Sequence, residues 1–165
     1  MLSPAVSPDA RLAELGIELP ELPRPTGTYV PFRRDGGTVY LAGQTCEWNG
    51  RMLYTGKVGQ DVDLETGQAA ARICALNLLS ALRSALGGSL GGVETCLRLG
   101  GFVNAAPDFP DVPLVINGAS NLMADIFGGE VAQHARTAVG VATLPQCAAV
   151  EVDAIFAVRE GRPSA

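Results

Sequence analysis

The sequence is poor in the residues on which basic or metal-dependent sites depend. It has a single histidine, His134, and 12 lysines and arginines against 17 aspartates and glutamates. The resulting net charge of −5 argues against a general nucleic-acid binder, which needs a basic face. Its one adjacent basic pair, Arg33-Arg34, is too small to make such a face. Since metal-ligating residues do not cluster along the chain, we expect no metal and no cofactor.

Cysteines are few and scattered, and long apolar runs are missing. No CxxC motif occurs, so neither a zinc knuckle nor a thioredoxin-type motif is indicated. We expect the cysteines to be buried free thiols in a reducing compartment. No apolar run approaches the roughly 18 residues of a membrane span, and the N-terminus does not resemble a signal peptide. A cytoplasmic protein without membrane association is therefore expected. The cysteines are Cys46, Cys74, Cys96 and Cys147.

What the chain does contain suits one folded domain. Its 165 residues are 47% hydrophobic, which is enough to form a real core. Residues 1–28 are predicted to be an N-terminal lead, with a short helix capped by Ser7 and a proline-rich connector over 19–28. Residues 29–160 are predicted to form a single domain.

Hydrophobic periodicity predicts two helices and five or six strands. The clearest helix is 64–86, where small and apolar side chains recur at three and four and Gly87-Gly88 follows. Two helices against one face of a mixed sheet make an α+β two-layer domain. In chain order we expect strands 29–32, 38–44 and a short 52–55, helix 64–86, strand 93–103, helix 115–127, and strands 137–143 and 148–158.

The last two strands are expected to pair as a hairpin about Leu144-Pro145. In that arrangement Arg136 lies opposite Asp153 and diagonal to Glu151, within reach of a long side chain. A guanidinium and a carboxylate on one sheet face can be a structural ion pair. They can also be half of a site, in which the guanidinium grips a substrate carboxylate and the acid moves a proton.

These residues resemble the signature of the YjgF/RidA family of enamine and imine deaminases, in a less characterised branch. The interval between the arginine and the glutamate is the family's own. The resemblance covers roughly 29–158. The residues that carry it are Arg136, Leu144-Pro145, Val150-Glu151-Val152, Ile155-Phe156-Ala157-Val158 and, upstream, Tyr29 and Val39-Tyr40-Leu41-Ala42-Gly43-Gln44.

The resemblance implies a chorismate-mutase-like fold that assembles as a homotrimer with clefts between subunits. It also implies hydrolysis of a small enamine or imine to a keto acid and ammonia, without a cofactor. Arg136 would hold the substrate's carboxylate, and Glu151 would act as acid and base through the attacking water. Such imines hydrolyse spontaneously, so a small polar cleft would suffice to accelerate the reaction.

Four further residues are expected to line the cleft. Tyr29 either matches an aromatic on the cleft wall or is an ordinary half-buried strand tyrosine. Gly43 matches a glycine whose backbone lines the pocket, and Asn117 is a looser match. His134 stands two residues before Arg136, which places both on one face of an extended strand. It is either an ordinary strand-end histidine or a proton donor or acceptor in the cleft.

Two departures from the family pattern leave a second function open. Ala138 stands where the well-known deaminases have cysteine, and Ala42 where they have serine, so the cleft loses polar atoms. The alternative is a non-catalytic module that binds a small carboxylate or keto acid; ribonuclease action is a third candidate, against which the acidic charge counts. Ser120 has no histidine or acidic partner that the sequence reveals, and Lys57 is expected on an exposed glycine-rich loop without a catalytic role.

Overall fold

Five strands form one mixed sheet in the order β1-β2-β7-β5-β6. The structure is a computed structural model that describes residues 6–22, 24–25 and 27–160. Only the pair β5–β6 is parallel, and the other neighbours are antiparallel. The strands are β1 Phe32–Asp35, β2 Thr38–Thr45, β5 Val93–Asn104, β6 Ala135–Val141 and β7 Val150–Val158, and a separate small hairpin joins β3 Glu47–Trp48 to β4 Arg51–Met52.

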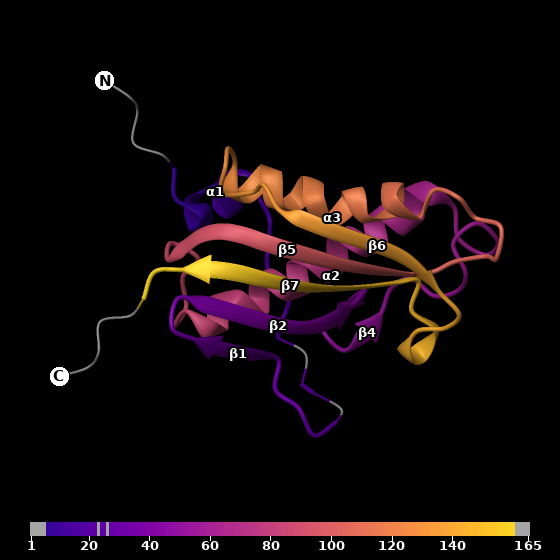
Figure 1. Ribbon diagram of the computed structural model, residues 1–165, viewed down its shortest axis with the longest axis horizontal. Coiled ribbons are helices and arrows are strands. Elements are labelled where there is room, and N and C mark those ends of the chain that lie inside the picture. Colours follow the sequence, from indigo (N-terminus) through magenta and orange to yellow (C-terminus); the bar gives the residue numbers. More distant parts are fainter. Residues whose placement is uncertain (1–5, 23, 26, 161–165) are drawn as a thin grey trace.

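Two long helices, α2 (Leu64–Ala85) and α3 (Val112–Phe127), cover one face of this sheet, and Figure 1 is drawn from the other, open face. The short helix α1 (Pro8–Glu14) packs on α3 and buries Leu12. Ser7 caps α1 by accepting the amide hydrogen of Ala10 at 3.2 Å. The predicted α+β class, a mixed sheet with two helices on one face, is confirmed.

The prediction of a terminal hairpin is wrong. Strand β5 lies between β6 and β7, so Arg136 is in register with Leu99 and Asp153 with Gly100. The cause is burial: one face of β7 is completely buried, which requires neighbours on both sides, whereas most of β6 is exposed and suits an edge. The segment after β6, with the 3₁₀ turn Pro145–Cys147, carries the chain past β5.

The first hairpin is also shifted from its predicted position. Tyr29 lies before the sheet, and β1 begins at Phe32 rather than ending there. Pro31 lacks an amide hydrogen and cannot donate to a ladder, so regular pairing starts after it. The turn is correspondingly shorter than predicted, with Gly36 at φ 53° between β1 and β2.

The core lies between the helices and the sheet, and α2 supplies its densest part. Asp63 caps α2 by accepting the amide hydrogen of Thr66 at 2.8 Å, and the helix ends one residue before the predicted limit. Gly118 of α3 lies directly against the backbone carbonyl of Gln68, so the two helices touch at their main chains. Cys46, Cys74 and Cys96 are buried free thiols, as predicted, while Cys147 is exposed. The core face of α2 includes Ala71, Cys74, Ala75, Leu78 and Leu82.

One irregularity in the sheet bears on the site. Leu41 pairs with Ala154, but the next registered pair is Gln44 with Val152, so β2 carries one extra residue there. This is the arrangement of a β-bulge, which bends a strand and redirects its side chains. Gly43 lies inside the bulge.

Candidate functional site

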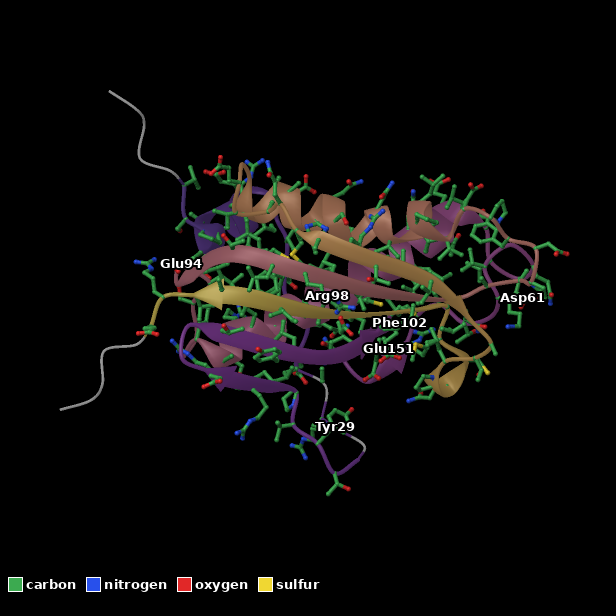
Figure 2. The ribbon with its side chains drawn as sticks, viewed as in Figure 1. Tyr29, Asp61, Glu94, Arg98, Phe102 and Glu151 are labelled. Atoms are coloured by element: carbon green, nitrogen blue, oxygen red, sulfur yellow. The ribbon has the colours of Figure 1, made fainter. Side chains whose placement is uncertain are left out.

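Three of the predicted site residues surround one hollow of about 120 Å³. Tyr29 comes from the loop before β1, Gly43 from the bulge in β2, and Glu151 from the start of β7. In Figure 2, Tyr29 lies on that loop beyond the β1 edge of the sheet, while Glu151 lies on the sheet itself. We call these three residues the carboxylate half-site.

The local structure perturbs the carboxyl group of Glu151. Burial raises its pKa above the ordinary value, and the nearby negative charge of Asp153 raises it further. Asp153 is itself paired with Arg98 at 2.7 Å, which limits that second effect. A side chain at Gly43 would collide with the carboxylate of Glu151, so only glycine leaves the carboxylate its present place. The hollow therefore holds an acid that retains its proton to a higher pH than an exposed glutamate does.

Two other predicted residues meet on the far side of the sheet. The guanidinium of Arg136 donates from Nη1 to Oδ1 of Asn117 at 2.8 Å and to Oγ of Ser120 at 3.1 Å. Asn117 and Ser120 are three apart on α3, so they share the helix face that lies over β6. Among the described residues, no carboxylate forms a salt bridge with Arg136. Its charge is thus held in place by neutral groups.

The imidazole of His134 also contacts Ser120. Its Nε2 lies 2.9 Å from Oγ of Ser120, and its Nδ1 lies 2.7 Å from the carbonyl oxygen of Ala132. Sequence reasoning missed Ser120, although its spacing from Asn117 places both on one helix face. We call Asn117, Ser120, His134 and Arg136 the guanidinium half-site.

One chain does not bring the two half-sites together. Arg136 pairs with Leu99, which is fully buried under the helices, and it contacts α3. Glu151 alternates with the buried Val150 and Val152, so it faces the open side. The half-sites therefore lie on opposite faces of the sheet, with β5 between the strands that carry Arg136 and Glu151.

Lys57 was predicted to be exposed, and this prediction is wrong. It is half-buried, and its Nζ donates to Oδ1 of Asn104 at 2.9 Å and to the carbonyl oxygen of Ala142 at 2.8 Å. These contacts tie its loop to the ends of β5 and β6. In the described part of the chain, no three acidic, histidine or cysteine side chains lie together as a metal site would require. No helix of that part is both long and apolar enough to cross a membrane.

A mixed five-stranded sheet backed by two helices, with the pocket of Glu151 on the open face and the guanidinium of Arg136 on the edge strand, is a chorismate-mutase-like α+β fold. The family model described as "YjgF/chorismate mutase-like, putative endoribonuclease" matches residues 9–157. The chain belongs to this YjgF/RidA family.

Individual relatives agree with this assignment. Protein TCP17 of Trypanosoma cruzi is 44% identical over 146 residues, which cover 88% of this chain and 91% of that protein. The crystal structure of Atu1372, a protein of unknown function from Agrobacterium tumefaciens, is 44% identical with a TM-score of 0.84, and 92% of each chain is covered. TdcF of E. coli, solved with bound serine, is 25% identical with a TM-score of 0.55, covering 86% of this chain and 94% of its own.

Proposed function

We propose that this protein hydrolyses small enamines or imines of amino acids to keto acids and ammonia. The observation that carries the proposal is the state of Arg136: it is exposed, held through Nη1 alone, and unpaired with any carboxylate in the described chain. Its Nε and Nη2 groups keep their hydrogens for a ligand. A guanidinium in this state suits bidentate binding of a substrate carboxylate.

The chemical step is assigned to Glu151 and a water molecule. The oxygen of water adds to the imine carbon, a proton passes to the nitrogen, and cleavage of the carbon–nitrogen bond releases ammonia. A carboxyl group whose pKa is raised can accept and return that proton nearer neutral pH than an ordinary glutamate. Tyr29 and the backbone at Gly43 confine the substrate beside it.

In this proposal two copies of the chain complete each cleft. Because one chain holds its half-sites on opposite faces of the sheet, the guanidinium half-site of one subunit would face the carboxylate half-site of the next. A head-to-tail contact of this kind closes into a ring, and a homotrimer is the ring we propose. The open face also offers an apolar surface for the contact, since Tyr40 is 50% exposed and Val139 is 39% exposed.

A binding module without turnover is the second candidate. Ala42 lies in the bulge beside Gly43. Ala138 lies two residues after Arg136 on β6 and is half-buried against the core. Neither supplies the polar atom that the well-known deaminases have there. This loss favours binding of a small carboxylate or keto acid, with Arg136 as its anchor.

Ammonia release from an imine generated in situ from an amino acid tests the proposal. We expect Arg136→Ala to lower kcat/KM about 10- to 100-fold, because a hydrogen-bonded charge pair contributes about 1.5–3 kcal/mol. Arg83→Ala, in the last turn of α2 and outside both half-sites, is the matched control and should retain activity. If a keto acid raises the Tm but no ammonia is released from the imine, the deaminase proposal is rejected and the binding module is favoured.

Subunit mixing tests the shared cleft. Arg136→Ala and Glu151→Gln subunits are each expected to have, alone, about a tenth of wild-type activity or less. When they are unfolded together and refolded as a mixture, about a quarter of the clefts should contain both intact half-sites, so about a quarter of wild-type activity should return. An active wild type together with an inactive mixture would contradict a cleft shared between copies.

A further inference from the structure

The contact between Ser120 and His134 has the geometry of a nucleophile and its base. The carbonyl oxygen of Ala132 can only accept a hydrogen bond, so Nδ1 of His134 carries the hydrogen in their 2.7 Å contact. In the neutral ring, Nε2 then has the free lone pair, and it lies 2.9 Å from Oγ of Ser120. The serine hydroxyl therefore donates to the imidazole, as it does when a histidine takes up a serine's proton.

Arg136 is a second partner of the same serine oxygen. Its Nη1 donates to Oγ of Ser120 at 3.1 Å, while Asn117 fixes the same nitrogen at 2.8 Å. A fixed positive charge beside Oγ stabilises negative charge that develops there and on an attacked carbonyl oxygen. Ser120 therefore has both a proton acceptor and a cation within hydrogen-bond distance of its oxygen.

The serine can also be reached from solvent. Ser120 is half-buried, and with His134 it lines an open hollow of about 470 Å³. The rest of the lining is uncharged: Ala124, Gly129, Ala132 and Gln133. The hollow offers no acidic side chain that would repel an anionic compound.

We propose that Ser120 is a nucleophile for acyl transfer and that the guanidinium half-site hydrolyses small esters that carry a carboxylate. Oγ of Ser120 attacks the ester carbon while its proton moves to Nε2 of His134. The ester's carbon–oxygen bond breaks, and the departing alkoxide takes that proton. Water then attacks the acyl-serine, gives its proton to Nε2, and releases the acid as Oγ recovers the proton. The free nitrogens of Arg136 would bind the substrate's carboxylate.

An alkyl fluorophosphonate provides the direct test, because a bond between Oγ and phosphorus forms as fluoride leaves. With the full-length wild-type protein we expect one adduct, located on Ser120 by peptide mass mapping. Ser120→Ala should abolish it, and His134→Gln should slow it about 10²- to 10⁴-fold through loss of the base. Ser84→Ala, which removes an exposed serine on α2, should label like the wild type.

Ester hydrolysis is the second measurement. After subtraction of the uncatalysed rates, kcat/KM for the mono-4-nitrophenyl ester of succinate should exceed that for 4-nitrophenyl acetate, and Arg136→Ala should remove that preference. Absence of an adduct in the wild type, an adduct on another residue, or equal labelling rates in wild type and His134→Gln would each overturn the proposal. Neither measurement involves an imine or Glu151, so failure of the deaminase proposal would be seen separately.

Discussion

Substitution of Gly118 by alanine tests whether the contact between α2 and α3 is as close as the structure has it. A methyl group on Gly118 would overlap the carbonyl oxygen of Gln68, with that residue's carbonyl carbon at 2.8 Å and its Cα at 3.0 Å. These are main-chain atoms inside a helix, which cannot turn aside as a flexible side chain can. The helices must therefore separate to accept the new methyl group.

The expected magnitude follows from two opposing effects. Overpacking of a tight contact costs about 1–3 kcal/mol, and a backbone neighbour places this case in the upper half. Replacement of a helical glycine by alanine returns about 1 kcal/mol. The net loss of about 1–2 kcal/mol should lower Tm by about 2–8 °C in a domain of this size. Movement of α3 would also draw Asn117 and Ser120 away from Arg136.

Thermal unfolding followed by circular dichroism measures the effect. Gly92→Ala is the matched control, because the nearest atom to its added methyl group would be Cδ1 of Leu86 at 3.8 Å, an ordinary contact. If Gly118→Ala unfolds at the same temperature as wild type, or higher, while Gly92→Ala is neutral, the close approach of the two helices is refuted.

Three further variants have defined outcomes. The folded state raises the pKa of Glu151, so the stability that this group contributes to the wild type is lost as pH rises. The Tm of Glu151→Gln minus the Tm of wild type should therefore be larger at about pH 7.5 than at about pH 4. An equal difference at the two pH values would contradict this. Gly43→Ala should displace the carboxylate of Glu151 and reduce ammonia release about tenfold or more, and undiminished release would show that the carboxylate's place is irrelevant. Asp63→Ala should lower the Tm by about 2–4 °C, because it removes the hydrogen bond to the amide of Thr66, and an unchanged Tm would rule out the cap.

The elements of this fold could be predicted because their signals are local. Apolar spacing predicted α2 to within one residue, and alternation predicted β2, β5 and β7 closely, whereas the bounds of β1, β4 and β6 were shifted. The order of strands in the sheet could not be predicted in the same way. Neighbours in sequence usually pair, and that tendency produced a hairpin where β5 in fact separates β6 from β7. Whether a strand is central depends on burial of its whole face, which its own sequence indicates only in part.

The site residues show the same difference between what local sequence signals predict and what depends on the strand order. The resemblance to a family picked out Tyr29, Gly43 and Glu151, which the fold brings around one hollow. Nothing in the sequence indicated that Arg136 lies on the opposite face, because that depends on the strand order. The contact of His134 with Ser120 joins the start of β6 to the middle of α3 and uses a main-chain carbonyl as its second partner. Such a contact exists only once helix and sheet have packed.

The position of β7 also has a consequence for synthesis of the protein. Every other strand of the sheet leaves the ribosome before β7, yet β7 occupies the centre and joins β2 to β5. Until it emerges, β1–β2 and β5–β6 are two separate pairs, and each exposes an unpaired edge. The nascent chain is therefore most exposed to aggregation and to chaperone binding just before β7 is synthesised, and a premature stop before Val150 would leave the two strand pairs unjoined.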